Sequence, residues 1–420
     1  MRGQRMPLWR ADKTSFTLIL TLLGSCLALA GVCALSGSSS NQAELSRREV
    51  ALSSLVLSTS TAFWPTLLSN ADVEIGTGTS IQIPLTLQPR LAAYTVSYRV
   101  GGARTEAIVD TGSPFLLVPK PSSSTCAPSY EWGGCFNPQE VSQVPGMTRT
   151  VERFDGNQGY VDWANAAFSF DRTLDDESTK INDVYPLTSS SADQSALFPV
   201  QNLTFGLLSE SLMDGTGGIF LGLVKYTDER IRPSFLSQSN VEAFSIDLRN
   251  IEGRVKSLSL YGGAYRYMPG QGVPIPLVRD LNQHFGDPTI HYCSVADKIF
   301  VNDNLLASST RNEKLYVIFD TGCSGLQLSP ALFDQRYAEA RANKEKNLFG
   351  KVDITFKAAD GNPVKLSSKR PLTTPLGSDR PWGKRINGYL VIVGLAFLDG
   401  QMMTVDTCND QIYFKTNESI

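Results

Sequence analysis

The sequence predicts a mostly β protein made of two related lobes. Three observations predict it: short runs of β-branched and aromatic residues alternate with turn residues, an Asp-Thr-Gly motif occurs twice, and each copy is followed by an apolar run that ends in Gly-Leu. Such runs, bounded by Gly, Pro, Asn and Ser, are typical of strands. Of the 420 residues, 42% are hydrophobic and 19% are charged, so the chain can bury a substantial core.

The expected elements follow the turn signals along the chain. Gly101-Gly102 lies between two apolar runs and predicts a tight hairpin. One long helix is expected at 330–347, where Ala, Glu, Lys and Arg are frequent. The clearest strands are expected at 81–87, 94–100, 106–109, 243–248, 258–261 and 315–319.

The internal repeat predicts how the lobes are related. The first Asp-Thr-Gly begins at Asp110 and is followed by the apolar run 218–223; the second begins at Asp320 and is followed by 389–395. The order of elements is the same in both copies while the loops differ in length, which is typical of two related units. The predicted lobes are 72–248 and 249–420.

Charge and histidine content exclude several function classes. The net charge of −3 gives no reason to expect a nucleic-acid partner. The chain has two histidines, which argues against histidine-based nucleophilic triads and multi-histidine metal sites. Hydrolytic chemistry would therefore depend on carboxylates, and we expect neither a metal nor another cofactor.

Residues 1–71 are expected to be a targeting region. Basic residues precede the apolar run 16–35, which ends in the small-residue pattern of a signal-peptidase site. A membrane anchor through 16–35 is the alternative, since about 20 apolar residues can span a bilayer. Arg47-Arg48 then precedes a milder apolar stretch that ends in Ser69-Asn70-Ala71, and this unit resembles a twin-arginine signal.

Two export signals in series resemble the staged targeting of a protein to the thylakoid lumen of a plastid. The alternatives are one secretory signal, which would give an extracellular protein, and an anchor followed by a stalk. A mature N-terminus near Asp72 would support the lumen, whereas one near Leu35 would contradict it. We expect no long pro-segment after residue 71.

The doubled motif carries the predicted chemistry. Each Asp stands at the end of an apolar strand, and the Gly two positions later lets the backbone approach a carboxylate closely. If the two turns meet across a pseudo-twofold axis, the carboxyl groups cannot both ionise easily and share one proton. One carboxylate can then act as general base on a water while the other carboxyl acts as general acid.

At these residues the sequence resembles the pepsin-like aspartic proteases, over most of 90–416. That family's carboxyl pair is the standard example of a shared proton. The resemblance implies an all-β fold of two pseudo-twofold related lobes with a few short helices. It also implies an aspartic endopeptidase that hydrolyses extended polypeptides in the cleft between the lobes, with Asp110 and Asp320 as the catalytic residues.

The resemblance also assigns supporting roles around the pair. Thr111 and Thr321 would hydrogen-bond across the lobe interface and lock the two loops together. Gly112 and Gly322 would offer backbone N–H groups near the carboxylates.

The residue after each motif differs between the copies. By the resemblance, the Ser113 hydroxyl would donate to the outer carboxylate oxygen of the first motif. Cys323 takes the equivalent place in the second copy, and a thiol is a much weaker donor than a hydroxyl. This difference predicts a displaced acid limb in the pH–rate profile.

The candidate flap departs from the family's pattern. The family usually has a flap Tyr that hydrogen-bonds to a Trp on the strand after the first motif, and here Leu117 stands at the Trp position. We therefore expect a flap held by packing, over a hydrophobic cleft lined by Phe115, Leu117 and Phe154. The residues assigned to the flap are Arg153, Phe154, Asp155 and Gly156.

The cysteines outside the targeting region have different expected roles. Cys126 and Cys135 resemble the small disulfide loop that these proteases carry after the first motif. Whether Cys293 pairs with Cys408 is left open by the sequence. Cys323 is expected to be a free, partly buried thiol.

Three function classes stay in competition. The leading one is a monomeric aspartic endopeptidase with polypeptide substrates, most active at acidic pH. The second is a catalytically weak or inactive pepsin-fold protein that binds or inhibits, as some plant inhibitor proteins do. The third is a membrane-anchored sensor that uses its lobes for recognition.

Overall fold

The computed structural model describes most of the chain after residue 78. All of its described residues belong to one compact unit, Asp72–Ile420. The predicted targeting region and the Cys126–Cys135 loop lie outside the described residues. Within the described part, no helix has the length and apolar character needed to cross a membrane. The described residues are 79–89, 91–119, 141–154, 157–170, 195–199, 202–211, 219–226, 232–263, 272–281, 289–345, 347–377 and 388–416.

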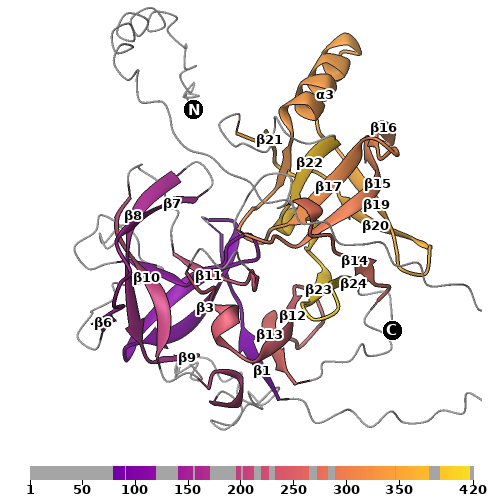
Figure 1. The fold of residues 1–420 in the computed structure, drawn as a ribbon. Coiled ribbons are helices and arrows are strands. Elements are labelled where there is room, and N and C mark those ends of the chain that lie inside the picture. The colour runs from indigo at the N-terminus through magenta and orange to yellow at the C-terminus, as the bar shows by residue number, and fades with distance from the viewer. Residues whose placement is uncertain are drawn as a thin grey trace, which may run out of the picture. The chain divides into compact units, whose positions relative to one another are not determined.

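The described chain is mostly β, which confirms the predicted class (Figure 1). All the expected strands form, and the run expected at 81–87 is divided into two strands at Leu85. The strands are β1 (Ser80–Pro84), β2 (Thr86–Gln88), β3 (Ala93–Val100), β4 (Ala103–Asp110), β12 (Val241–Asp247), β13 (Ser257–Gly262) and β17 (Lys314–Phe319).

The predicted hairpin at Gly101-Gly102 is present. β3 and β4 pair antiparallel, with Val100 opposite Ala103. Gly101 and Gly102 have φ values of 53° and 77°, which is the left-handed conformation that a two-residue hairpin turn needs at both positions. Residues with a side chain would be strained there, so the two glycines fix the register of this pair.

The predicted helix is shorter than expected. α3 runs over Pro330–Ala342, so the prediction that it reaches residue 347 is wrong. Lys344 has a φ of 53°, outside the right-handed helical region, and the N–H of Glu345 turns back to the carbonyl of Ala340. The buried Arg336 binds the Glu345 carboxylate and holds the chain in this turn.

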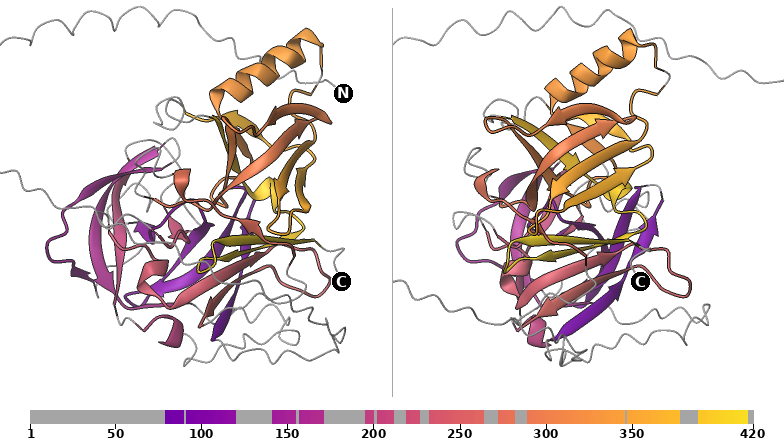
Figure 2. Two further views of the ribbon diagram at one scale, coloured as in Figure 1. Left: turned by 45° about the vertical axis from the view of Figure 1, so that its right-hand side comes forward. Right: turned by 90° about the vertical axis from the view of Figure 1, so that its right-hand side faces the viewer.

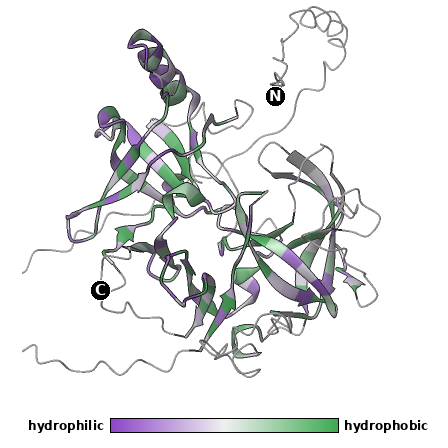
Figure 3. Cartoon of the chain, turned by 180° about the vertical axis from the view of Figure 1, so that it is seen from behind, coloured by the Kyte–Doolittle hydropathy of each residue, from purple (hydrophilic) through white to green (hydrophobic). Residues whose placement is uncertain are grey.

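α3 covers one end of a sheet with a single face. Its buried residues Leu332, Arg336 and Ala340 are four positions apart and therefore lie on the same side of the helix. Figure 2 shows α3 against the strands of the C-terminal half. Figure 3 shows hydrophilic and hydrophobic residues interspersed along α3, and Asp334, Gln335 and Arg341 are among its exposed residues.

Two five-stranded sheets form the N-terminal half of the described chain. One has the order β5-β10-β8-β6, with β7 paired to β8, and the other has the order β11-β4-β3-β2, with β9 paired to β3. The first four residues of β3 and the last four of β4 are all buried, as expected for strand segments covered on both faces. The additional strands are β5 (Leu117–Pro119), β6 (Ser142–Gln143), β7 (Thr150–Phe154), β8 (Asn157–Ala166), β9 (Phe168–Phe170), β10 (Leu203–Ser211) and β11 (Phe220–Gly222).

One eight-stranded sheet forms most of the C-terminal half. Its order is β20-β19-β15-β17-β22-β18-β21, with β16 paired to β15. The central strand β17 is buried at every position after Lys314, which explains its unbroken apolar sequence. The additional strands are β15 (Cys293–Val301), β16 (Asn304–Ser308), β18 (Leu326–Leu328), β19 (Val352–Lys357), β20 (Pro363–Ser368), β21 (Thr373–Pro375) and β22 (Gly388–Val393).

A six-stranded sheet draws strands from both predicted lobes. Its order is β1-β13-β12-β23-β24-β14, and β12 pairs with β23 along its length. The predicted boundary at residue 248 falls between β12 and β13, which pair with each other, so this sheet is shared by the two segments. Its remaining strands are β14 (Ile275–Pro276), β23 (Gln401–Asp406) and β24 (Gln411–Thr416).

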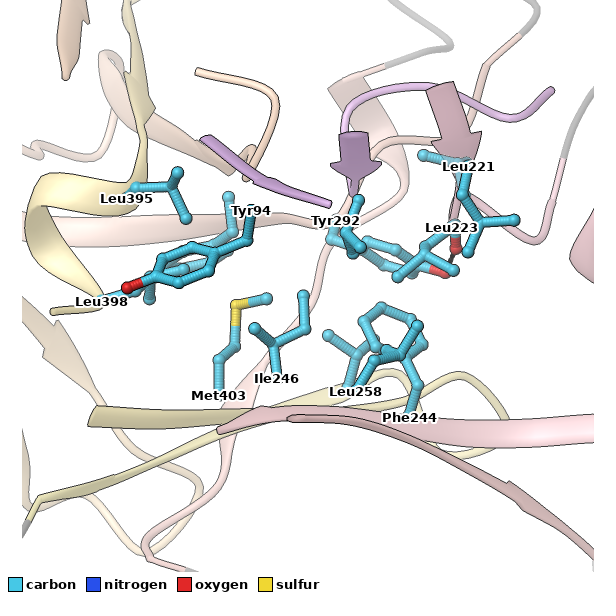
Figure 4. Close-up of a cluster of buried hydrophobic side chains, with 14 of the residues drawn as sticks. Tyr94, Leu221, Leu223, Phe244, Ile246, Leu258, Tyr292, Leu395, Leu398 and Met403 are labelled. Atoms are coloured by element: carbon cyan, nitrogen blue, oxygen red, sulfur yellow. Dashed lines mark hydrogen bonds between the residues drawn. The ribbon is translucent and has the colours of Figure 1, made fainter. Parts of the chain in front are cut away.

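Apolar side chains from this shared sheet support the residues around the two motifs. Figure 4 shows Phe244, Ile246 and Met403 rising from the sheet toward Tyr94 and Tyr292. The three side chains from the sheet are at most 2% exposed. Burial of each such side chain contributes about 1.5–3 kcal/mol to the free energy of unfolding. This layer therefore stabilises the packing around the motifs.

Candidate active site

The two Asp-Thr-Gly motifs occupy equivalent places in the two halves. β4 ends at Asp110 and lies parallel to β11, with Gly222 beside Asp110. β17 ends one residue before Asp320 and lies parallel to β22, with Val393 beside Phe319. The repeat found in the sequence is therefore a repeat of structure, in which each aspartate leaves a buried strand next to its apolar partner strand.

The glycine of each apolar-Gly-Leu run supports the turn after the aspartate. The N–H of Gly222 donates to the carbonyl of Phe115 at 2.9 Å, and the N–H of Gly394 donates to the carbonyl of Gly325 at 2.8 Å. A Cβ at Gly222 would lie 2.5 Å from the Ser113 carbonyl oxygen. The turn packs directly on the glycine, so only a residue without a side chain fits there.

Thr111 and Thr321 join the two motifs through reciprocal hydrogen bonds. The Thr111 N–H donates to the Thr321 hydroxyl at 3.1 Å, and the Thr321 N–H donates to the Thr111 hydroxyl at 2.9 Å. The Thr321 hydroxyl donates to the Val109 carbonyl at 2.7 Å, and the Thr111 hydroxyl donates to the Phe319 carbonyl at 2.8 Å. These buried bonds connect residues 210 positions apart and fix the two turns against each other.

Thr321→Val replaces a hydroxyl with a methyl group of similar size and is expected to destabilise the fold. The substitution leaves the Thr111 N–H and the Val109 carbonyl without this hydroxyl in a buried site, which should lower the free energy of unfolding by roughly 2–4 kcal/mol. Urea denaturation measures the change. Thr321→Ser keeps the hydroxyl and should lose much less, whereas equal losses in the two variants would show that the hydrogen bonds are not the cause.

Each motif's glycine lies against the other motif's carboxyl group. A Cβ placed on Gly112 would lie 2.5 Å from Asp320 Cγ, and one placed on Gly322 would lie 2.6 Å from Asp110 Oδ1. The N–H of Gly112 donates to Asp110 Oδ1 at 2.8 Å, and the N–H of Gly322 donates to Asp320 Oδ1 at 2.8 Å. The absence of a side chain at both glycines is what allows the two carboxyl groups to meet.

The electrostatics of the pair are asymmetric. Burial raises the pKa of Asp110 well above its ordinary value, and the charge of Asp320 and a hydrogen bond to the Asp320 carboxyl raise it further. The N–H groups of Gly112 and Gly322 act in the opposite direction but do not reverse the shift. Asp110 is 7% exposed, whereas Asp320 is half-buried and Gly322 is exposed. Burial and the neighbouring carboxyl group therefore both favour the protonated form of Asp110, and Asp320 is the more exposed member of the pair.

The backbone carbonyls of the residues that follow the two motifs accept from different positions, two residues after Gly222 in one half and one residue after Gly394 in the other. The Ser113 carbonyl accepts from the N–H of Val224 at 3.0 Å, and the Cys323 carbonyl accepts from the N–H of Leu395 at 2.9 Å. Cys323 is half-buried and packs against an apolar cluster that includes Tyr316. The roles of the Ser113 hydroxyl and the Cys323 thiol toward the carboxyl groups stay predictions.

The structure answers the open question of the second cysteine pair. Cys293, Cys323 and Cys408 are all free thiols. Cys293 is buried in β15, and this burial raises the pKa of its thiol, while Cys408 is exposed. Cys293 and Cys408 are therefore not bonded to each other.

The apolar residues after the first motif do not lie as expected. Phe115 is 7% exposed and Leu117 is fully buried, so the prediction that they line an open cleft is wrong. They pack in a small core with Val161 and Trp163 of β8, because alternation along that strand directs both of these side chains to one face. Trp163 thus fills the space beside Leu117, a contact that no local signal in the sequence predicts.

The candidate flap falls at the turn of a hairpin. β7 and β8 pair antiparallel, with the backbone of Phe154 opposite that of Asn157. The side chains of Arg153 and Phe154, and all of Asp155 and Gly156, lie outside the described residues. Their assignment to a flap and to substrate binding therefore stays a prediction.

The part of the chain that the structure describes offers no cluster of metal-ligating side chains. A group of three or more His, Cys, Asp or Glu residues that could hold a metal ion is not found among these residues. No protein-family model matches the chain, and a search of curated proteins finds no significant similarity.

Proposed function

We propose that this chain is an aspartic endopeptidase that hydrolyses extended polypeptides. One observation carries the proposal: two carboxyl groups on equivalent turns are hydrogen-bonded to each other, and each lies against the other motif's glycine. Two aspartates in unrelated turns would not be expected to have reciprocal threonine hydrogen bonds between those turns. A perturbed pKa in a pair that solvent can reach is typical of catalytic carboxyl groups.

The proposed reaction uses the asymmetry of the pair. The Asp320 carboxylate would take a proton from a water molecule as the water oxygen attacks the peptide carbonyl carbon, and the Asp110 carboxyl would donate its proton to the carbonyl oxygen. Collapse of the tetrahedral intermediate breaks the C–N bond: the amine leaves with the proton that Asp320 took up, and one hydroxyl of the intermediate returns a proton to the Asp110 carboxylate. The two aspartates end with the same total of protons, so neither a metal nor a covalent intermediate is required.

We also propose a pepsin-like arrangement of two pseudo-twofold related lobes. Support comes from the parallel pairs β4–β11 and β17–β22, which carry the motifs in the same way, and from the six-stranded sheet to which both segments contribute. In such an arrangement the carboxyl pair stands between the lobes, where an extended peptide could lie across it.

The function is tested by digestion of an unstructured protein at acidic pH, with and without pepstatin. We expect cleavage that pepstatin abolishes. Cleavage that persists with pepstatin and in Asp110→Asn would contradict an aspartic mechanism. Pepstatin binding without cleavage would instead favour a pepsin-fold binding or inhibitor protein.

Cys323→Ser is expected to move the acid limb of the pH–rate profile toward lower pH. A serine hydroxyl is a stronger donor than the thiol and would stabilise the charged form of the second motif's carboxyl group. The pH dependence of kcat/KM measures the change, with Cys408→Ser as the control because that thiol is exposed. An unchanged acid limb in Cys323→Ser would show that position 323 does not tune the pair.

A further inference from the structure

Arg232 lies in a cluster of side chains beneath the β7–β8 hairpin. Its guanidinium carbon lies 4.4 Å from the centre of the Trp163 ring and 5.3 Å from that of Phe115. The two rings meet edge to face at 5.1 Å, so the cation lies against both. Its side chain is 18% exposed, and its Nε is buried with no hydrogen-bond partner among the described residues.

A chain of polar contacts ties Arg232 to both strands of the hairpin. Arg232 Nη2 pairs with Glu152 Oε1 on β7, in an ion pair whose acidic side chain is 16% exposed. The Thr150 hydroxyl donates to the same carboxylate at 2.7 Å, and Trp163 Nε1 on β8 donates to the Thr150 hydroxyl at 2.9 Å. Each polar group in the chain therefore orients the next.

The same segment is joined to the loop that follows Asp110. The N–H of Phe235 donates to the carbonyl of Pro114 at 2.8 Å. The carbonyl of the next residue, Phe115, accepts from Gly222, which lies beside Asp110. Arg232 thus contacts the hairpin through Glu152 and Trp163, and the motif loop through Phe115.

A charged side chain costs more free energy to bury than an apolar side chain of similar size. Partial burial of a guanidinium removes hydration that an apolar side chain would not lose, and in some proteins buried ion pairs contribute to specific placement more than to stability. The stacking on Trp163 and the ion pair with Glu152 both depend on where β7 and β8 lie relative to the loop. An ion pair with fixed geometry at this place can therefore set where the hairpin lies.

We propose that Arg232 is a positioning residue that fixes the β7–β8 hairpin against the Asp110 loop and so sets how tightly a peptide substrate binds. The role of Arg232 in substrate binding rests on the proposed peptidase function, while its hold on the hairpin does not. Asp110 itself is held by the threonine bonds and by Gly222, so loss of Arg232 should affect substrate binding more than the chemical step.

Arg232→Met tests the proposal, because methionine keeps much of the apolar volume and removes the charge. We expect KM for an extended peptide to rise about tenfold, with kcat per pepstatin-titrated site within about twofold of the wild type. The amide hydrogens of β7 and β8 should exchange faster in hydrogen-exchange measurements on the full chain. Arg232→Lys keeps a cation and should recover part of both effects.

Arg149→Met is the matched control. Arg149 pairs with Asp162 through two contacts of 2.7 and 2.9 Å on the same hairpin, and Asp162 alternates with Trp163 and so lies on the opposite face of β8. This variant also removes one cation and one ion pair from the hairpin. We expect KM and exchange in β7 and β8 to stay close to the wild-type values.

Glu152→Gln removes the charge of the other partner and tests the same ion pair if Arg232→Met folds poorly. It should also raise KM. The KM of the double variant should be no higher than that of Arg232→Met alone, because the two residues act as a pair. Unchanged KM and exchange in Arg232→Met or Glu152→Gln would overturn the proposal. If the wild type neither cleaves peptides nor binds pepstatin, the peptidase function fails, and the exchange data alone then decide whether Arg232 holds the hairpin.

Discussion

Asp110→Asn is expected to lower kcat by roughly 10³- to 10⁴-fold, because an amide can neither hold nor deliver the proton that the reaction needs. Asn has nearly the same shape, so the hydrogen bonds of Thr111 and Gly112 can persist. Steady-state kinetics at acidic pH measures the loss. Asp303→Asn is the control, because that side chain is 78% exposed and its φ of 64° suits Asn. Equal activity in the Asp110 and Asp303 variants would contradict the proposed mechanism.

Asp110→Asn also tests whether the folded protein holds a proton on Asp110, because this proton makes stability depend on pH whereas a general effect on the fold does not. The pKa of Asp110 is raised in the folded state from its ordinary value of 3.8, so the unfolded chain loses this proton first as pH increases. The stabilisation from Asp110 is therefore fully present below pH 3.8 and is lost as pH rises toward the folded-state pKa, at up to about 1.4 kcal/mol per pH unit. Asn does not titrate and removes this dependence.

Urea denaturation of the wild type and Asp110→Asn across acidic to neutral pH measures that difference. We expect the wild type to lose stability relative to the variant as pH rises. Carboxylates whose pKa is lowered by partners, such as Asp247 beside Arg249 and Glu345 beside Arg336, change stability in the opposite sense but are shared by both proteins. A difference that does not vary with pH would show that Asp110 does not hold the proton.

Gly322→Ala is expected to lower kcat by about 100-fold or more. The new methyl group would lie 2.6 Å from Asp110 Oδ1 and 2.7 Å from Asp110 Cγ, which is closer than atoms can approach without displacement. One carboxyl group must move, and small displacements of reacting groups cost large factors in rate. Overpacking of this kind should also lower the free energy of unfolding by about 1–3 kcal/mol.

Gly253→Ala is the control for the stability loss. Gly253 has a φ of 73°, and no atom lies within 4 Å of the place that an alanine methyl group would take, so alanine there is strained but meets nothing. It should lose about 1–2 kcal/mol of stability with kcat unchanged. If Gly322→Ala retains the kcat of Gly253→Ala, then close contact between the motifs is not required for activity.

The strands and the motif pairs could be predicted because their signals are local. The apolar runs of β4 and β17, the two-glycine turn after β3, and the matching Gly222 and Gly394 each carry their information within a few residues. A buried strand needs apolar side chains, and the turn after β3, with positive φ at both positions, favours glycine. The end of α3 was missed because a contact from Arg336 to Glu345, rather than helix propensity, decides it.

Other features depend on which distant residues meet. Leu117 could face a cleft or a core, and Trp163 on β8 decides for the core. Arg232 and Glu152 are 80 positions apart, and neither has a neighbour in the sequence that signals the pair. The raised pKa of Asp110 is also not a local property, since it follows from the burial of this aspartate and from the nearby Asp320 carboxyl group.

The sequence by itself determined that two like turns, each with an aspartate, would form at the ends of buried strands. Only the tertiary structure decided that the turns face each other, that Asp110 is the more buried of the two acids, and that Arg232 braces the neighbouring hairpin. The physical reason is one of range: backbone conformation and strand burial are set by nearby residues, whereas proton sharing and ion pairing are set by distances that exist only after the chain has folded.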